Sequence, residues 1–375
     1  MRGSRKRLAV GVPALGVALA VLSGAGALPF GRVAAAQAAS LPGSPAQLIL
    51  DAQLPDGAIT QWIDRSRIDP YLANYAAMGL AKTYAAGGDS RYLRAGWRWL
   101  SWYKTHMDAA GYVTDYSVGP GPGYAETSTG DMDSTDGYAG TFLLALRQTF
   151  DASGDTETLR GFTGAVRKAV DAIRSTQQSD GLTWATPDYH AGLLMDQAEA
   201  YAGLRAAAAL ATDLGMPSLA VKADMAAAAI RRAVAGLWQA DGSAFAVARF
   251  EDGSLDRAGW TTYYPGATSQ AWAVAVGNGL SPDAPLMAPA RARTLMSTFS
   301  SRWPQWTSPD AQVAFDGGTH AVEYWPLVGG ALVAVGQAST GRQGTQAVVS
   351  SARDRQWQWP FSVGAAGQSL LVSQG

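Results

Sequence analysis

Apolar positions recur along this chain with the spacing of amphipathic helices, and these helices come in pairs. In each pair an apolar helix follows a loop rich in Asp, Gly and aromatic residues, and a second Ala-rich helix completes a unit of roughly 55–75 residues. The first helices of these units are expected to begin near Asp69, Asp133, Asp188, Tyr263 and Thr319. A helical hairpin repeated in this way predicts a closed ring.

The loops that precede these helices share one character. They read D-G-A-I-T-Q from Asp56, A-G-Y-V-T-D-Y from Ala110, D-G-L-T-W-A-T-P-D-Y from Asp180 and D-G-S-A-F-A-V-A-R from Asp241. In a ring of hairpins, equivalent loops lie at the same end of the molecule. We therefore expect the acidic and aromatic loops to gather around one mouth.

Charge separates the helices into two classes. Segments 137–146, 267–276 and 324–335 are nearly uncharged, whereas 162–174 carries a charged stripe. A helix that is apolar all round is buried, and a helix with a polar stripe lies at the periphery. The sequence thus predicts an all-α (α/α)6 toroid in one domain, with five clear pairs and a sixth pair split between the two ends. The expected helices cover 44–54, 69–86, 89–106, 134–150, 155–177, 190–214, 218–238, 265–277, 285–300, 320–336, 344–353 and 366–372, with a long loop at 111–130.

The first forty residues have the pattern of a targeting segment. Basic residues between Arg2 and Arg7 precede an apolar run from Leu8 to Leu28, and small residues at 34–38 offer cleavage sites. We expect residues 1–39 to be a signal peptide, residues 40–375 to be the toroid domain, and the protein to be secreted. The alternative is an uncleaved membrane anchor, because the apolar run is about long enough to cross a bilayer. The chain has no cysteine, so a large core must replace disulfides.

Composition favours a globular protein and excludes one class of partner. Of the 375 residues, 47% are hydrophobic and 16% are charged, which is ample for a buried core. Five basic residues and no acidic ones lie in the targeting segment, so 24 basic and 30 acidic residues remain beyond it, a net charge of −6. Nucleic acid is excluded as a partner, since phosphate binding needs a basic surface.

The predicted architecture resembles the six-hairpin (α/α)6-toroid glycosidases, a superfamily of carbohydrate-active enzymes. Ser134-Thr135-Asp136-Gly137 is similar to the A-T-D-G-D signature of glycoside hydrolase family 8, which implies that Asp136 lies beside the scissile sugar. Tyr138 stands in place of the second Asp of that signature. I-D-P-Y-L-A-N-Y, from Ile68, stands where the family has S-E-x-x-G-Y-G-M, so no catalytic Glu is implied there.

Glycoside hydrolysis needs one carboxylic acid to protonate the leaving oxygen and one carboxylate to activate water. The candidate catalytic residues are Asp69, Asp133, Asp136 and Asp188 at the expected helix starts and Glu126 in the preceding long loop. Carboxylates as dense as those between Glu126 and Asp136 raise one another's pKa values, which keeps a general acid protonated near neutrality. Asp196 is interpreted as a buried, hydrogen-bonded polar residue.

Two simpler explanations of these acids remain open. Asp69, Asp133, Ser134 and Asp188 have the positions of helix N-caps. The 126–136 segment is also oxygen-rich enough for calcium, although it departs from the EF-hand pattern. No metal site and no cofactor are predicted, because His320 and Glu323, three residues apart, have no further ligand pair near them.

Aromatic and polar residues in the loops and first turns suit a saccharide, because sugar rings stack their apolar faces on aromatic rings. The alternative is that these rings pack the loop layer. The candidate substrate-binding residues are Tyr71, Tyr124, Trp184, Tyr189, His190, Trp260, Tyr263, Tyr264, Trp306, His320 and Glu323.

These features together favour a secreted, monomeric glycoside hydrolase acting on a polysaccharide or oligosaccharide. A polysaccharide lyase is the first alternative, with Tyr263, Tyr264, His190 or His320 as base, but the expected mouth offers few cations for a uronate: Arg65, Arg67, Arg249 and Arg257. A second alternative is a non-catalytic saccharide-binding or assembly protein. A third, a ring that grips a terpenoid or a protein partner, predicts a mouth without clustered carboxylates.

Overall fold

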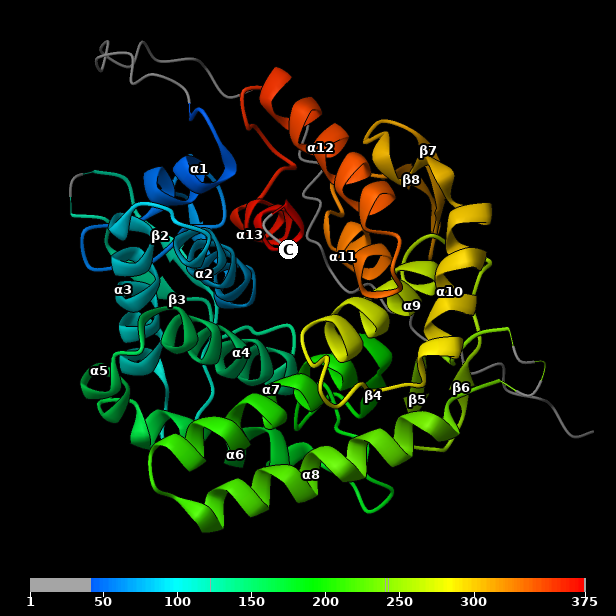
Figure 1. Cartoon of the computed structure of the whole chain (residues 1–375), viewed down its shortest axis with the longest axis horizontal. Helices are drawn as coiled ribbons and strands as arrows, with labels where there is room; N and C mark the ends of the chain where they lie inside the picture. The colour runs from blue at the N-terminus through cyan, green and yellow to red at the C-terminus, as the bar shows by residue number, and fades with distance from the viewer. Residues whose placement is uncertain (1–41, 122, 240, 242, 374–375) are drawn as a thin grey trace, which may run out of the picture.

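Twelve main helices form a closed double ring in the computed structural model, which describes residues 42–121, 123–239, 241 and 243–373 (Figure 1). The inner ring consists of α2 (Pro70–Ala85), α4 (Thr135–Ser153), α7 (Leu194–Asp213), α9 (Gly266–Val274) with its π-helical continuation (Ala275–Gly279), α11 (Leu327–Ala334) and α13 (Val363–Ser373). The outer ring consists of α1 (Pro45–Ala52), α3 (Ser90–His106), α6 (Thr163–Thr176), α8 (Pro217–Gly236), α10 (Pro289–Arg302) and α12 (Ala338–Asp354), with the short α5 (Thr156–Arg160) before α6. The predicted (α/α)6 toroid is confirmed.

The ring closes between the two ends of the described chain. The last inner helix, α13, packs against both α2 and the first outer helix, α1. The backbone N–H of Val363 donates to the carbonyl of Gln61 at 3.0 Å, and Trp357 Nε1 donates to the carbonyl of Pro42 at 2.6 Å. The sixth pair is therefore split between the two ends, as the sequence predicts.

Small residues bring the inner helices close together. A Cβ on Gly79 of α2 would lie 2.6 Å from the carbonyl oxygen of Gly367 in α13. A Cβ on Gly140 of α4 would lie 2.6 Å from the carbonyl oxygen of Glu199 in α7, and Gly203 faces Gly140 from the other side. Real Cβ atoms do not approach backbone this closely, so glycine at these positions sets the spacing of neighbouring helices.

Within the described residues, all strands lie in the loops that lead from an outer helix to the next inner helix. Residues 53–69, 107–134, 177–193, 237–265, 303–326 and 355–362 form these loops, and together they make one end of the ring, here called the mouth face. Three small antiparallel sheets hold the mouth face together. They are β1 (Arg67–Ile68) with β2 (Tyr116–Val118) and β3 (Glu126–Ser128); β4 (Ala191–Leu193) with β5 (Ala248–Phe250) and β6 (Leu255–Asp256); and β7 (Gln312–Phe315) with β8 (Gly318–Ala321).

Two inner helices begin later than the sequence predicts. The third begins at Leu194, because residues 191–193 pair with β5 as strand β4. The fifth begins at Leu327, because residues 318–321 form β8 instead of the expected first helical turn. Positive φ angles at Gly317 and Gly318 turn that hairpin, and Pro326 precedes the first helical residue.

Smaller differences concern other boundaries. The helix expected at 155–177 is divided into α5 and α6 at Gly161 and Phe162. The helix expected at 285–300 begins at Pro289, and the one expected at 344–353 begins six residues earlier, at Ala338. The loop expected at 111–130 contains the β2–β3 hairpin.

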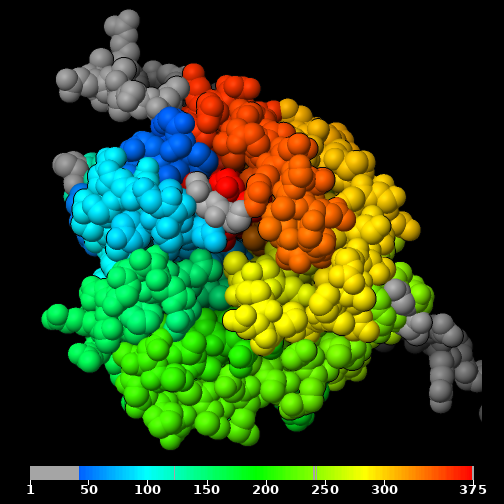
Figure 2. Space-filling view, viewed as in Figure 1, coloured from blue at the N-terminus to red at the C-terminus, as the bar shows by residue number. Residues whose placement is uncertain are grey.

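The face opposite the mouth is the one seen in Figure 2, where the molecule is hollowed near its centre. A cavity of about 420 Å³ lies there, lined by residues toward the C-terminal ends of α2, α4, α11 and α13, among them Ala85, Ala152, Ala334 and Val372. In the part of the chain that the structure describes, no helix is both long and apolar enough to span a bilayer. The expected signal peptide, residues 1–39, lies outside the described residues.

Candidate active site

Glu199, in the second turn of α7, is the most heavily hydrogen-bonded carboxyl group inside the ring. Its Oε1 accepts from the Tyr71 hydroxyl at 2.7 Å, the Tyr75 hydroxyl at 2.6 Å and Trp272 Nε1 at 2.8 Å. Its Oε2 is buried and has no partner among the described residues. Burial raises the pKa of Glu199 to about 7, while the three donors oppose the rise because they favour the ionised form.

Asp136, in the first turn of α4, is fully buried beside Glu199. Its Oδ2 accepts from the Thr183 hydroxyl at 2.5 Å, and its Oδ1 accepts from the backbone N–H of Gly137 at 2.9 Å. Burial and the nearby Glu199 raise the pKa of Asp136 to about 7, against the effect of these hydrogen bonds. Asp136 is thus held rigidly beneath the mouth face, with both oxygens engaged.

Asp196, in the first turn of α7, has a different environment. Its side chain is only 7% exposed, and its Oδ2 has no partner among the described residues. Burial, and then the charges of Asp136 and Glu199, raise its pKa well above the ordinary value. The expected burial of Asp196 is confirmed, whereas the expected hydrogen bond is not found for Oδ2 among the described residues. Burial without a hydrogen-bond donor favours the protonated form of the carboxyl group.

Asp133 and Asp69 precede α4 and α2 and complete the group of acids. The Asp133 side chain is exposed, yet the protein around it, followed by Asp115, raises its pKa. Burial and Asp115 raise the pKa of Asp69 to about 7, and its Oδ1 caps α2 by accepting from the Leu72 N–H at 3.1 Å. Asp69 is therefore an N-cap, whereas the N-cap of α4 is Ser134 and leaves Asp133 free of that role.

A second hydrogen-bonded network of polar side chains lies next to the first turns of α2. Tyr138 Oη donates to Asp115 Oδ1 at 2.8 Å, and Arg67 forms an ion pair with the other oxygen of Asp115. The Tyr138 ring stacks on the Tyr71 ring, with centroids 6.0 Å apart. Because Tyr71 also binds Glu199, the two networks meet at these rings, which form the first part of an aromatic wall beside the acids. Tyr138, which departs from the family 8 signature, thus positions Asp115 and Tyr71.

Aromatic rings from α2, α9 and the loop before α11 continue this wall. Trp272 contacts Tyr75 and Trp325 edge-on, at 6.1 and 6.0 Å between centroids, and Tyr264 lies 5.5 Å from Trp325 in a tilted arrangement. Tyr264 also lies within electrostatic reach of Asp133 and Asp196, and all three factors, burial first, raise its pKa. Tyr189 is 37% exposed, and partial burial, followed by the charges of the same two acids, raises its pKa to about 12.

The predicted catalytic residues are thus only partly brought together. Asp69, Asp133 and Asp136 lie in the group, but Asp188 is exposed in the turn before β4 and caps no helix. Glu126, on β3, lies against the outer helix α3, where Oε2 accepts from Trp102 Nε1 at 2.9 Å and lies 3.6 Å from His106 Nε2. Burial and Asp56 raise the pKa of Glu126 to about 7. This shift therefore comes from the surroundings of Glu126 against α3 and not from the group of acids inside the ring.

The predicted substrate-binding residues divide in the same way. Tyr71, Tyr189 and Tyr264 lie within electrostatic reach of the acids. Tyr124 instead accepts a hydrogen bond from the Arg65 guanidinium at 2.5 Å. Trp184 stacks on His190 at 3.8 Å, and His190 Nδ1 lies 3.0 Å from Glu251. Trp184 and Glu251 border a second cavity, of about 180 Å³, against β4 and β5, lined also by Asp180 and Arg249.

The remaining aromatic candidates pack the loop layer. Trp260 is 8% exposed and donates to the carbonyl of Ser243, Tyr263 is fully buried, and Trp306 packs against Gly344 of α12. His320 lies on β8 and its Nδ1 is 4.0 Å from Glu323, so the helical face expected for this pair does not exist. Burial raises the pKa of Glu323.

Three contributors are not among the residues expected from the sequence: Glu199, Asp196 as an acid, and Trp272. The signal lies in L-M-D-Q-A-E-A-Y from Leu194, where two acids three residues apart interrupt the otherwise uncharged first half of an inner helix. A charge on a helix that is buried all round needs partners from neighbouring helices, which marks a polar interior site. The partners themselves come from α2 and α9, more than sixty residues away.

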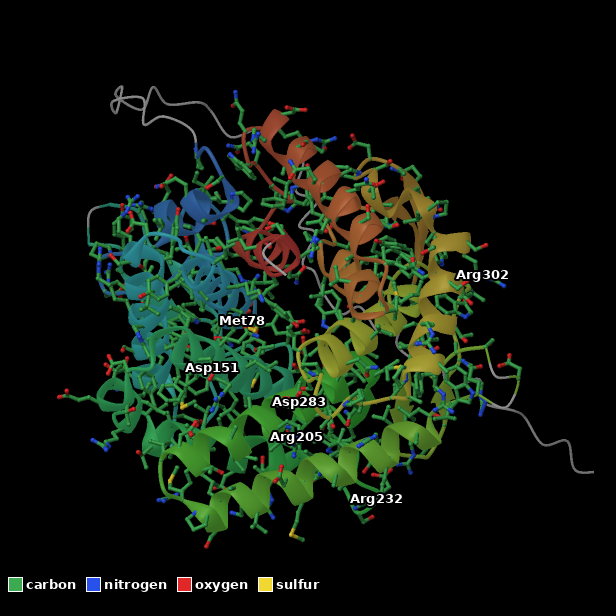
Figure 3. All side chains as sticks on the ribbon, viewed as in Figure 1. Met78, Asp151, Arg205, Arg232, Asp283 and Arg302 are labelled. Atoms are coloured by element: carbon green, nitrogen blue, oxygen red, sulfur yellow. The ribbon has the colours of Figure 1, made fainter. Side chains whose placement is uncertain are left out.

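The larger cavity is not this site. It lies at the other end of the inner helices, where Figure 3 shows Asp151 on the face toward the viewer. Asp151 is paired with Arg147 at 2.5 Å, so the cavity contributes no free acid from that position. Within the described ranges, no group of three or more His, Asp and Glu side chains is arranged to hold a metal ion.

No protein-family model matches the chain, and no curated protein matches it in sequence. Several solved structures share its fold. One, named as a wild-type glycosidase, matches with 15% identity and a TM-score of 0.61 over 88% of this chain and 94% of its own. A family 63 mannosylglycerate hydrolase from Thermus thermophilus, in complex with glucose, matches with 11% identity and a TM-score of 0.62 over 89% and 99%.

A rhamnosidase from Klebsiella oxytoca with rhamnose bound matches with 15% identity and a TM-score of 0.58, over 84% of this chain and 60% of its own. At these identities the likeness establishes a fold shared with glycoside hydrolases, and the chemistry has to be argued from the site.

Proposed function

We propose that this protein is a secreted glycoside hydrolase in which Asp196 is the general acid and Asp133 is the carboxylate that activates water. The observation that carries the proposal is the Asp196 carboxyl: it is 7% exposed, it has an unpartnered Oδ2, and its pKa is raised well above the ordinary value. A carboxyl group whose pKa is raised in this way is suited to protonate a glycosidic oxygen.

Asp133 suits the complementary role. It is exposed to water, it is not used as a helix cap, and it acts electrostatically on Tyr264 and Tyr189, as Asp196 does. The two acids therefore face a common region of the mouth face. Asp136 and Glu199 are fully buried and hydrogen-bonded, and they are positioning residues. Their negative charge adds to the effect of burial and raises the pKa of Asp196 further.

The rings around the acids suit a sugar. Tyr264, Trp325 and the exposed Tyr189 present aromatic faces beside Asp133 and Asp196. The solved structures with this fold include proteins named with glucose and rhamnose bound, which supports a saccharide as the substrate class. A relationship to family 8, based on Asp136, and export with removal of residues 1–39 are parts of the same proposal.

The lyase alternative has less support. A lyase needs a base and a cation for the uronate, but Arg67 pairs with Asp115, Arg249 pairs with Asp180, and Arg65 donates to Tyr124 and to the carbonyl of Asp51. Burial raises the pKa of both Tyr263 and Tyr264, which disfavours the phenolate that a tyrosine base requires.

The test is hydrolysis of a panel of polysaccharides and aryl glycosides by wild type, Asp196→Asn and Asp133→Asn. Loss of general acid or base catalysis is expected to lower the rate of reducing-end release about 10²–10⁴-fold. Asp188→Asn is the matched control, since Asp188 is an exposed acid on the same face, and it should retain wild-type activity.

The readout separates the alternatives. Ultraviolet-absorbing unsaturated products would assign a lyase, and retention of a glycan without any product would assign a binding protein. Full activity of Asp196→Asn, with its fold verified by circular dichroism, would refute the assigned acid.

A further inference from the structure

The loop between α12 and α13, residues 355–362, is one of the six loops of the mouth face. The Val363 N–H donates to the carbonyl of Gln61, in the loop before α2. On the other side, Phe361 contacts Tyr324 edge-on, with ring centroids 5.1 Å apart, in the loop before α11. The loop is therefore fixed between the loop before α2 and the loop before α11, two helices of the inner ring.

Two aromatic residues anchor this loop and a third does not. Trp357 is 2% exposed and donates to the carbonyl of Pro42, and Phe361 is 1% exposed. Trp359, midway between them, is 58% exposed. The anchors hold the backbone on both sides, so the large apolar face of Trp359 is presented to solvent by a fixed support.

Few large hydrophobic side chains are exposed, and the aromatic ones among them lie on the mouth face. Among the described residues the exposed large hydrophobic side chains are Tyr189, Val221, Met225 and Trp359. Val221 and Met225 lie on the outer helix α8, whereas both aromatic ones lie in mouth-face loops.

The two exposed aromatic residues lie in loops that precede opposite helices of the inner ring. Around the inner ring the order is α13, α2, α4, α7, and each helix packs on the next. Trp359 precedes α13, Asp69 precedes α2, Asp133 precedes α4, and Tyr189 precedes α7. Because neighbouring helix axes lie about 8–10 Å apart, α13 and α7 face each other across a ring of six at a distance of about 20 Å.

We propose that Trp359 is a stacking platform for a sugar unit remote from the cleaved bond, so that the substrate is a saccharide chain that crosses the mouth face from Tyr189 past the acids to Trp359. This inference rests on the proposed function and specifies its substrate class as a polymer or long oligosaccharide, not a small glycoside. Binding energy gained at Trp359 would hold the saccharide chain so that the bond to be cleaved lies at the acids.

The experiment compares Trp359→Ala, Trp359→Phe and Met225→Ala. Affinity electrophoresis in gels containing xylan, mixed-linkage β-glucan, mannan or dextran measures binding without turnover. We expect at least one of these glycans to retard wild type, Trp359→Ala to bind it about tenfold more weakly, and Trp359→Phe to recover most of the binding, since it keeps an aromatic face. Met225→Ala, at an even more exposed site on the outer helix α8, should bind as wild type.

Kinetics provides the second readout. On the glycan that binds, Trp359→Ala should raise KM about tenfold with little change in kcat, whereas 4-nitrophenyl glycosides should be cleaved as by wild type. Equal retardation of Trp359→Ala and wild type, or no retardation of wild type by any of the four glycans, overturns the platform. Retardation that depends on Trp359 without hydrolysis of any probe leaves the platform standing and refutes the hydrolase instead.

Discussion

At the scale of single residues, the site is governed by carboxyl groups that cannot all be ionised together. Asp136, Asp196 and Glu199 are buried within electrostatic reach of one another, and burial raises the pKa of each. A raised native pKa means that the folded protein binds the proton more tightly than the unfolded chain does. The stabilisation is thus complete below the unfolded pKa and is lost as the pH rises through the folded one.

Asp136→Asn tests this directly. The pKa of Asp136 rises from an ordinary 3.8 to about 7, so the ionisation that the variant avoids costs stability progressively between those two values. The free energy of unfolding of the variant minus that of wild type should increase from pH 4 to pH 7 and then level off, as measured by urea denaturation at several pH values. A flat or falling difference for Asp136→Asn would contradict the buried-acid interpretation.

Tyr75→Phe tests the clamp on Glu199. The Tyr75 hydroxyl donates to Oε1 and favours the ionised carboxylate, so its loss should raise the pKa of Glu199 above about 7. A hydrogen bond to a charged group contributes about 1.5–3 kcal/mol, which corresponds to a rise of about 1–2 pKa units. Carboxyl-carbon NMR titration of glutamate-labelled protein measures it. Tyr103→Phe, which alters a buried tyrosine on α3, should leave that titration unchanged.

At the scale of elements, glycine contacts set how far apart the acids lie. Gly140 and Gly203 touch where α4 crosses α7, one turn from Asp136 and Glu199 on those helices. Gly203→Ala would push a Cβ into the backbone of Gly140, and such overpacking costs about 1–3 kcal/mol. We expect a lower melting temperature together with a loss of hydrolysis. Gly236→Ala, at an end of α8 where a Cβ meets nothing within 4 Å, should keep both properties.

The elements also show what could be predicted from the sequence. Helical pairs, inner and outer classes and the mouth face follow from local periodicity and charge, which neighbouring residues determine. The starts of α7 and α11 were wrong because β4 and β8 form only through pairing with β5 and β7, a tertiary effect. Asp69, Asp133 and Asp136 were found from their place before or at helix starts, whereas Glu199 depends on donors from α2 and α9 that no local pattern relates to it.

At the scale of the whole molecule, stability and site geometry both depend on closure of the ring. The buried helix α13 covers the Gly79 face of α2 and the inner side of α1, and α2 in turn supplies Tyr71 and Tyr75 to Glu199. Each inner helix therefore has a neighbour on both sides, and removal of one exposes apolar surface on two others. This coupling predicts that the ring unfolds as one cooperative unit.

A chain ending at Ser362 tests the coupling. Without α13 the packing surface of α2 is open, and we expect calorimetry to show loss of the single transition, with hydrogen exchange accelerated in α2 and α1 before α8. A synthetic peptide covering residues 363–373 should restore protection when added in excess, because α13 contacts its neighbours through buried side chains such as Leu370 and Val372. If the shortened chain melted in one transition at the wild-type temperature, the inner ring would be stable while open, and the acids would owe their positions to local loop structure instead of closure.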